Sequence, residues 1–294
     1  MKKIVLAGGT GFLGSFLASR FRAEGYEVII ISRNSGHVLW KDMEGIVNAL
    51  NGADTVINLA GKSVDCRYNE KNRREILESR IGTTKAIGEA IQKCSFPPKL
   101  WINSSTATIY RHAEDKPMTE ATGEIGSGFS VNVARQWEKS FFDFDLPATR
   151  KVALRMAIVL GKGGGAMQPL KRLAQVGLGG KQGKGTQMFS WIHIEDVYEI
   201  MMFVRKHENL NGVFNCSSPN PVTNEAFMKA LRKPLKQRIG LPTPEWLLKV
   251  GAVAIRTETE LIFKSRWVVP DRLLKAGYRF TFPTLDRAFK DVLF

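Results

Sequence analysis

Cysteine is scarce in this chain of 294 residues, which contains only Cys66, Cys94 and Cys216. Three widely separated cysteines predict neither a disulfide framework nor a zinc site, and such low usage fits a reducing cytoplasm. No apolar run approaches the roughly 20 residues that a membrane-spanning helix needs. Lys2-Lys3 leads directly into a strand-like stretch instead of the apolar core of a signal peptide. We therefore expect a cytoplasmic protein without a membrane span and without a metal site.

The chain has fewer acidic than basic residues, 28 against 43. The formal net charge is +15 and the isoelectric point is near 9.8, a balance that is typical of nucleic-acid-binding proteins. The basic residues are nevertheless scattered, and the densest groups, residues 71–74 and 232–236, have no aromatic stacking motif. We favour a solvated basic surface that can also attract a phosphorylated cofactor or an anionic substrate. Nucleic-acid binding is the alternative.

A glycine-rich turn near the start of the chain is its most informative stretch. An apolar run over residues 4–7 predicts a buried strand, and Gly8, Gly11 and Gly14 follow it, before a helical pattern over residues 15–23. Gly8 allows a tight turn, Gly11 lets a pyrophosphate approach the backbone, and Gly14 lets the helix pack closely on the strand. The helix N-terminus then offers free N–H groups to the phosphates. We predict dinucleotide binding; a glycine-rich turn with no ligand is the alternative.

The first half of the chain alternates between expected strands and expected helices. Apolar runs predict strands over residues 27–31, 37–41, 55–61, 100–105 and 153–160. Helical patterns cover residues 43–51, 69–92 and 128–142. Because parallel strands need crossover helices, this alternation predicts an α/β fold with a Rossmann-type, doubly wound parallel sheet. We assign residues 1–160 to this first domain.

The second half of the chain has a different sequence pattern. Glycine-rich loops are expected over residues 163–165 and 177–185, as hinges or lids over a cleft or as plain surface loops. Helical patterns cover residues 168–176, 195–207, 224–231, 246–255, 258–263 and 270–276. We expect residues 161–294 to form a smaller, mixed but mainly helical C-terminal substrate domain that can share strands with the first.

The residues after the second expected strand, Ser32-Arg33-Asn34, indicate which coenzyme is bound. A protein that prefers NAD carries an acid here, which binds the ribose hydroxyls, and this chain has none. The Arg33 guanidinium can pair with a 2′-phosphate through two hydrogen bonds. We therefore predict NADP in preference to NAD, and an ordinary surface arginine is the alternative. Asp42 can reach the adenine amino group or be a plain loop residue.

Several segments resemble a known family. Three stretches resemble the extended short-chain dehydrogenase/reductases, namely Gly8–Gly14, Asn58–Gly61 and Ser104–Tyr110. Later stretches resemble the atypical, epimerase-like family 39 of this group. They are Leu154–Gly161, Gly179-Gly180 with Gln187, Ser190–Asp196 and Pro270–Tyr278. The similarity covers nearly the whole chain. It implies a Rossmann domain that binds NADP, a nominal nucleotide-sugar substrate and a small C-terminal domain of unknown role.

The glycine turn, the end of the second expected strand and the resemblance together give the cofactor-binding positions, which lie near the ends of expected strands except for Arg80 in an expected helix. By motif position they are Gly8, Thr10, Gly11, Phe12, Leu13, Gly14, Ser32, Arg33, Leu59, Ala60, Gly61 and Arg80. Arg80 falls where family members place a polar residue near the active site, and a solvated helix face is the alternative.

Catalytic positions follow from the same resemblance. In typical members a Ser or Thr after the fifth strand hydrogen-bonds the substrate oxygen, which implies Thr106 with Ser105 beside it. A Tyr then acts as general acid, and a Lys four residues later lowers its pKa. Here Ser130 and Ala134 fall near these two positions, so the usual proton carrier is missing. Tyr110 is a candidate substitute, although a Tyr at its position more often packs below the sheet.

Three residues are candidates for the substrate cleft, namely Arg155, Gln187 and Trp191. Arg155 stands at the C-terminal end of a strand, where open α/β sheets bind ligands, and it can hold an anion or form a structural ion pair. Core packing is the alternative for Trp191. We expect His193 and Asp196 to be mainly structural, with a proton relay as the alternative.

The sequence thus predicts an NADP-dependent oxidoreductase or epimerase that acts on a small polar, sugar-like substrate. The missing Tyr–Lys pair motivates a second hypothesis. In it, the protein binds NADP without catalysis, senses the redox state of the coenzyme and passes it to a partner.

Overall fold

The computed structural model describes residues 2–248, 258 and 260–294, and within them it contains a sheet of seven strands. Across the sheet the order is β10 (Gly212–Cys216), β6 (Arg150–Met156), β5 (Leu100–Thr106), β4 (Thr55–Asn58), β1 (Lys3–Ala7), β2 (Glu27–Ser32) and β3 (Val38–Leu39). All neighbouring strands are parallel. The strand order reverses between β1 and β4, which makes this the topological switch point.

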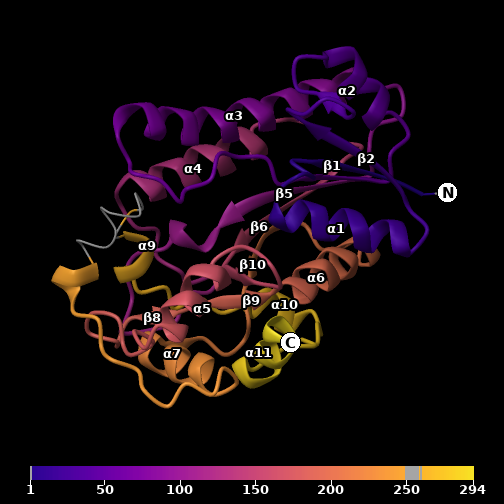
Figure 1. Cartoon of the computed structure of the whole chain (residues 1–294). Coiled ribbons are helices and arrows are strands. Elements are labelled where there is room, and N and C mark those ends of the chain that lie inside the picture. The colour runs from indigo at the N-terminus through magenta and orange to yellow at the C-terminus, as the bar shows by residue number, and fades with distance from the viewer. Residues whose placement is uncertain (1, 249–257, 259) are drawn as a thin grey trace.

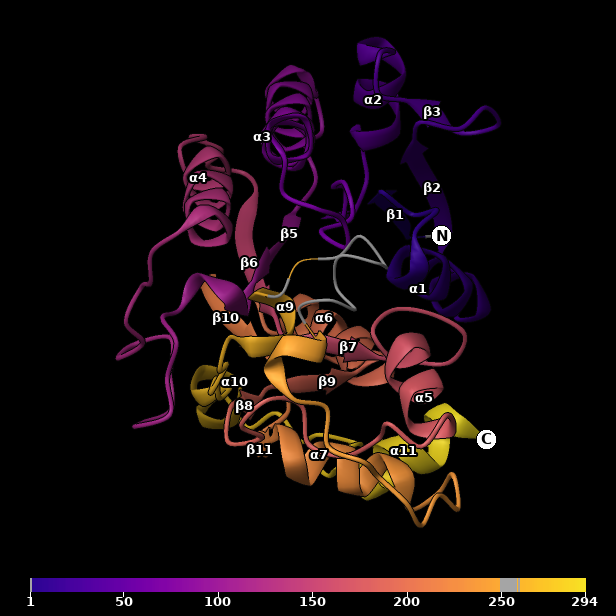
Figure 2. The ribbon, with the colours of Figure 1, turned by 60° about the vertical axis from the view of Figure 1, so that its left-hand side comes forward.

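Helices cover both faces of this sheet (Figure 2). One face packs against α1 (Phe12–Ala23) and α6 (Ile194–Lys206). The other face packs against α2 (Met43–Leu50), α3 (Glu70–Lys93) and α4 (Phe129–Phe142). The predicted Rossmann-type doubly wound parallel sheet is therefore confirmed.

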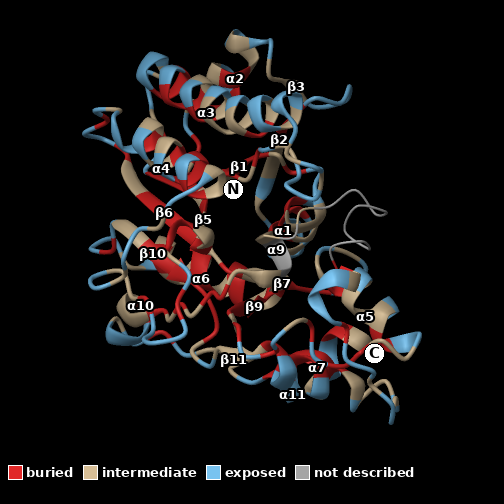
Figure 3. Cartoon of the chain, turned by 90° about the vertical axis from the view of Figure 1, so that its left-hand side faces the viewer, coloured by how far each residue is buried: buried red, intermediate tan, exposed pale blue. Residues whose placement is uncertain are grey.

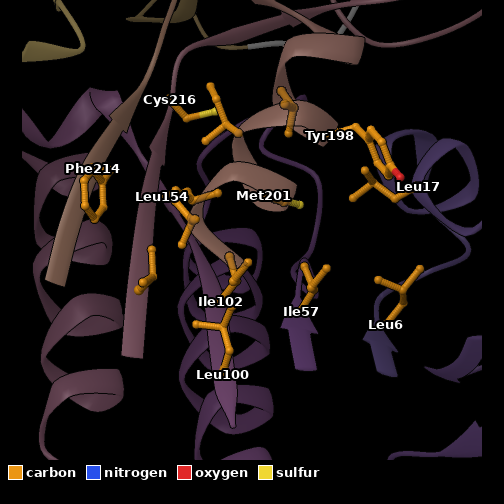
Figure 4. Close-up of a cluster of buried hydrophobic side chains, with 14 of the residues drawn as sticks. Leu6, Leu17, Ile57, Leu100, Ile102, Leu154, Tyr198, Met201, Phe214 and Cys216 are labelled. Atoms are coloured by element: carbon orange, nitrogen blue, oxygen red, sulfur yellow. The ribbon is translucent and has the colours of Figure 1, made fainter. Parts of the chain in front are cut away.

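The apolar runs of the strands explain this double coverage, because successive side chains of a strand point to opposite faces. In β1, Leu6 belongs to the cluster under α1 and α6, whereas Val5 belongs to the cluster under α2 and α3. Figure 4 shows Leu6, Ile57 and Leu154 pointing from three strands toward the side where Tyr198 and Met201 of α6 lie. A strand buried on both faces has to be apolar throughout.

A smaller lobe follows β6 and lies below the sheet in Figure 1. Its elements are β7 (Ile158–Leu160), α5 (Met167–Gln175), β8 (Met188–Phe189), β9 (Trp191–His193), β11 (Val222–Thr223), α7 (Asn224–Arg232), α9 (Glu260–Phe263), α10 (Asp271–Lys275) and α11 (Leu285–Leu293). A separate apolar core joins α5, α7 and α11 around the buried ring of Trp191. Figure 3 shows this second buried region apart from the sheet. No helix of the described residues is both long and apolar enough to cross a membrane.

The expected strand over residues 153–160 is in fact two strands. The backbone N–H of Ala157 donates to Cys216 O (3.0 Å), and the next N–H, of Ile158, donates to Ser190 O (3.2 Å). The chain therefore leaves the main sheet at Ala157, and β7 pairs with β9 instead. Periodicity does not reveal this change of partner, because both segments are apolar.

Several further elements differ from the sequence-based expectation, among them the short strands β8, β9 and β11, which were not predicted. Neither β10 nor α11 was predicted, and β10, from the second half of the chain, pairs with β6 in the main sheet. The expected helix over residues 246–255 lies largely outside the described residues.

His193 and Asp196 attach the C-terminal segment to α6. The carboxylate of Asp196 accepts hydrogen bonds from the backbone N–H groups of Thr281 (2.8 Å) and Phe282 (3.0 Å). The imidazole of His193 caps α6, because Nδ1 accepts from the N–H of Glu195 (3.2 Å), and it stacks on Phe282 with ring centroids 3.7 Å apart. These contacts show the structural role that the sequence favoured for both residues.

Burial lowers the pKa of His193 to about 4 from an ordinary 6.5, and the nearby Asp291 carboxylate opposes this shift. Between these two pH values the unfolded chain binds a proton that the folded protein does not bind. The free energy of unfolding should therefore fall by about 3 kcal/mol as the pH drops from 6.5 to 4. His193→Asn keeps a capping acceptor and should lose this part of the pH dependence in urea unfolding. If the free energy of unfolding depended on pH equally in the wild type and in His193→Asn, His193 would not be the group responsible.

Candidate functional site

The glycine turn lies at the carboxyl edge of the sheet, beside the switch point. Gly8 has a φ of +79°, and a Cβ atom there would lie only 2.8 Å from the backbone N of Ala60. A Cβ atom at Gly14 would lie 2.5 Å from Gly8 O. Both glycines are thus required by the protein's own packing, which holds β1, α1 and the loop after β4 against one another.

Gly11 differs from the other two glycines, because the protein's packing does not require it. A Cβ atom there would meet only Gly8 O, at an ordinary 3.7 Å. Gly11 is the N-cap of α1 and provides no capping side chain, so no side chain satisfies the first N–H groups of the helix. The open cradle and the positive end of the helix dipole together fit a pyrophosphate.

The loop after β2 exposes Arg33. Ser32 is buried, and its Oγ accepts a hydrogen bond from the N–H of Asn34 (3.0 Å), which turns the chain sharply at this point. Asp42 caps α2 by accepting from the N–H of Gly45 (2.8 Å). The Asp42 carboxylate therefore has a local structural partner, and Arg33 is the charged side chain at the end of β2.

A buried amide pair shapes the loop after β4. Asn58 Nδ2 donates to Asn103 Oδ1 of β5 (2.8 Å) and to Thr84 Oγ1 of α3 (3.3 Å). Asn58 Oδ1 accepts from the N–H of Ala60 (3.0 Å), which fixes the turn over Leu59–Gly61. The strand, the neighbouring strand and the covering helix thus position this loop jointly.

Arg80 of α3 lies under the same loop. Its guanidinium donates to Lys62 O (3.0 Å) and to Ile76 O (2.9 Å), and it lies 5.1 Å above the ring centroid of Trp137. Burial lowers the pKa of Arg80 to about 10, so the group stays charged at neutral pH. The structure places Arg80 under the loop after β4 and not on a solvated helix face. The positive charge of Arg80 thus lies near Gly61, and a Cβ atom added at Gly61 would lie 3.1 Å from Arg80 Cζ.

Arg155 is fully engaged within the protein. Its guanidinium donates to both carboxylate oxygens of Glu138, at 2.8 and 2.7 Å, and to the hydroxyl of Tyr110, at 2.8 Å. Ser105 Oγ donates to the same Glu138 (2.6 Å), and Tyr110 donates to Asn215 (2.9 Å). Although burial opposes it, Glu138 raises the pKa of Arg155 above its ordinary value. Of the two roles open to Arg155, the geometry shows the structural ion pair.

Thr106 ends β5 on the open side of the site. Its Oγ1 accepts a hydrogen bond from the N–H of Thr108 (3.1 Å), and among the described residues its hydroxyl proton has no acceptor. Lys264 Nζ donates to Thr108 O (2.7 Å), and Arg266 Nε donates to Thr108 Oγ1 (3.2 Å). The C-terminal lobe thus brings two cations to the end of β5.

The start of α4 faces the same region. Ser130, near the expected tyrosine position, donates from Oγ to Glu260 Oε2 of α9 (2.8 Å). The ring of Tyr68 packs edge-on against Phe129, with centroids 5.1 Å apart. A cavity of about 720 Å³ adjoins Glu260 and is lined by Arg111, His112, Ile125, Gly126, Ser127, Glu260, Phe263 and Lys264. Sequence reasoning missed Tyr68, Glu260 and Lys264, because no short motif contains them.

Gln187 and Trp191 do not line this cavity. Gln187 Nε2 donates to Gln182 O (2.8 Å), and Trp191 Nε1 donates to Asn220 O (3.2 Å). Both side chains are buried in the smaller lobe, and Trp191 belongs to its core. The structure therefore does not bring them together with Thr106 and Arg33, and the core-packing alternative describes Trp191.

The doubly wound sheet, the glycine turn at its switch point and the uncapped start of α1 define a Rossmann-type protein built for a dinucleotide. A model of the NAD dependent epimerase/dehydratase family matches residues 4–130, and a domain of unknown function, DUF1731, matches residues 243–292. The human epimerase family protein SDR39U1 is 33% identical over an alignment of 298 positions that covers 99% of each chain. The chain therefore belongs to the SDR39U1 group of epimerase family proteins, which confirms the resemblance inferred from its motifs.

Solved structures agree with this assignment. A crystal structure of human SDR39U1 (isoform 2) with NADPH superimposes with a TM-score of 0.89 at 31% identity, over 99% of this chain and 98% of the other. The nucleoside-diphosphate sugar epimerase from Corynebacterium glutamicum gives a TM-score of 0.78 at 27% identity, over 99% of this chain and 58% of the other.

Removing one partner of the buried ion pair should destabilise the fold strongly. Arg155→Met leaves the Glu138 carboxylate buried and unpaired, which should cost about 3–5 kcal/mol in the free energy of unfolding, measured with urea. The double variant Arg155→Met/Glu138→Met removes both charges and should be more stable than Arg155→Met alone. A loss below about 1 kcal/mol in the single variant, as for an exposed pair, would contradict the structural role.

Proposed function

We propose that this protein binds NADPH across the switch point and transfers hydride between the coenzyme and a small polar substrate, as an oxidoreductase or epimerase. The observation that carries the proposal is the cradle at Gly11, which the protein's own packing leaves open. A relative that covers almost the whole chain at 31% identity is crystallised with NADPH, which supports this choice of coenzyme.

The coenzyme is held along the carboxyl edge of the sheet. Backbone N–H groups at the start of α1, over residues 12–14, bind the pyrophosphate, and Thr10 and Gly11 precede them in the same turn. Arg33 pairs with the 2′-phosphate, and Ser32 holds the turn that presents it. The loop over Leu59–Gly61 would border the coenzyme, and Arg80 lies under this loop.

The substrate binds where β5 ends. NADPH, when bound, supplies a hydride from C4 of its nicotinamide ring. Thr106 donates a hydrogen bond to the substrate oxygen, because no described residue accepts its hydroxyl proton and its Oγ1 accepts only from the N–H of Thr108. Ser105 serves the site less directly, since its hydroxyl is committed to Glu138. Lys264 and Arg266 are cations near Thr108, which suits an anionic substrate such as a nucleoside-diphosphate sugar.

One observation favours a second function. The serine near the usual tyrosine position, Ser130, is bonded to Glu260, and Ala134, near the lysine position, is fully buried. A protein that binds NADPH without catalysis and reports its redox state to a partner is the alternative.

Selection of the phosphorylated coenzyme should depend on Arg33. Arg33→Ala removes a charge-assisted contact worth about 1.5–3 kcal/mol, so NADPH affinity should fall by about 10- to 100-fold while NADH affinity changes little. Titration calorimetry with both coenzymes measures this. Gly11→Ala is the matched control, because a methyl group in the pyrophosphate cradle should weaken both coenzymes alike. Equal losses for NADPH and NADH in Arg33→Ala would overturn the assignment.

Hydride transfer should be seen as substrate-dependent loss of NADPH absorbance with a panel of nucleoside-diphosphate keto-sugars and simple aldehydes. Thr106→Val removes one positioned donor and should lower kcat by about 10²-fold with NADPH affinity unchanged. Gln187→Ala, whose side chain does not line the cavity, is the control with unaltered kcat. Tight NADPH binding without turnover of any carbonyl compound would favour the non-catalytic alternative.

A further inference from the structure

The amino edge of the main sheet borders a second cavity, of about 1090 Å³. Its lining includes Thr55, Leu100 and Arg150, which begin β4, β5 and β6. Because these strands are parallel, they begin at the edge opposite to the glycine turn. At about 3.3 Å per residue, β5 separates the two edges by about 20 Å from Leu100 to Thr106. Figure 1 accordingly shows the N-terminus, which leads into β1, on the opposite side of the molecule from α9.

The end of α6 and the segment after α10 form another wall of this cavity. Phe203 and Tyr278 line it with apolar rings, which pack together with centroids 5.3 Å apart. Carbonyl groups at the end of a helix repel an anion unless they have partners. Here the guanidinium of Arg150 donates to Val204 O (3.0 Å), and the N–H of His207 donates to Phe203 O (3.0 Å). The end of α6 is therefore compatible with negative charge in the cavity.

Basic side chains predominate in the lining. Six lining residues are basic and three are acidic. The basic residues are Lys2, Lys99, Arg150, Arg205, Lys206 and Arg279. Two of the three carboxylates already have arginine partners, because Asp54 accepts from Arg205 (2.6 Å) and Glu199 lies 3.9 Å from Arg20. The acidic residues of the cavity thus do not balance its positive charge.

Four of these cations are available to a ligand. The side chains of Lys2, Lys99, Lys206 and Arg279 make no hydrogen bond or ion pair with any residue that the structure describes. They come from four separate parts of the chain, so the fold brings them to one cavity and not the local sequence. Like charges around a common space repel one another, and an anion between them relieves that repulsion. Ammonium and guanidinium groups bind phosphate oxygens through charge-assisted hydrogen bonds.

We propose that this cavity binds a phosphorylated small molecule, whose phosphate groups contact these four cations and whose apolar part packs against Phe203. The volume suits a ligand of nucleotide size, since ligand pockets typically measure about 300–1,000 Å³. All four cations line a single cavity, which suits a compact molecule better than the extended backbone of a nucleic acid. The site shares no residue with the coenzyme cradle and does not depend on the proposed function.

Titration calorimetry with ATP as the probe tests the site, because ATP combines phosphate groups with an aromatic base. The wild type should bind ATP equally with and without an excess of NADPH. Lys99→Gln/Lys206→Gln should weaken ATP binding by about 10-fold. The matched control is Lys85→Gln/Lys229→Gln, which removes the same charge at two exposed lysines outside the cavity and should leave ATP affinity unchanged.

Two results of this titration would overturn the proposal. Equal losses in the two double variants would show a diffuse effect of net charge and not a site. Displacement of ATP by NADPH would place the ATP in the coenzyme cradle. A failure of NADPH to bind would count against the proposed function alone, because the comparison of the two double variants needs no coenzyme.

Ala148→Trp tests the location without a change of charge. Ala148 lies in an exposed turn that lines the cavity, so an indole there should occupy the ligand's space without disturbing the core. ATP affinity should fall by at least about 10-fold, while circular dichroism and the unfolding temperature stay as in the wild type. Unchanged ATP affinity in this variant would contradict the assignment. Binding of a single-stranded oligonucleotide without binding of ATP would also contradict it, and would assign these basic residues to nucleic acid.

Discussion

The close approach of Gly8 to Ala60 is the contact on which the arrangement of the site depends. The backbone of the β1 turn and that of the β4 loop are too close for any side chain to come between them. This contact fixes the start of α1 beside the switch point of the sheet. Asn58, Asn103 and Thr84 then hold the same loop from below. Backbone packing thus forms the cradle, and charged side chains only border it.

Helix α4 connects this edge to the interior of the protein. Ser130, Ala134 and Glu138 are four residues apart and therefore share one face of the helix. Ser130 meets the C-terminal lobe through Glu260, and Glu138 binds Arg155 and Ser105 at the end of the sheet. One face of α4 thus contacts both the C-terminal lobe, through Ser130, and the end of the main sheet, through Glu138. The buried alanine between them, Ala134, contributes no charge to this face of the helix.

The parts of the structure that were predictable from sequence are those with local signals. The glycine turn, most strands of the main sheet and the helices between them follow from apolar runs and spacing, because strand and helix periods are properties of short segments. The partner of Arg155 was not predictable, since Glu138 lies 17 residues away and across a turn of the fold. Tyr68 meets Glu258 over 190 residues, and no local pattern reports such a contact. The short strand β10 was missed because its place in the sheet depends on pairing with β6 and not on its own composition.

The position of β10 also bears on how the chain is made. At the ribosome, β6 emerges well before β10, and for some seconds at about 5–20 residues per second its outer edge has no neighbour. An open strand edge of this kind invites association between nascent chains. Lys151 and Arg150 begin that edge strand, and their charges disfavour such pairing until Gly212–Cys216 arrives to cover it. The strand β10 thus covers an edge of β6 that stays open while the residues between them are translated.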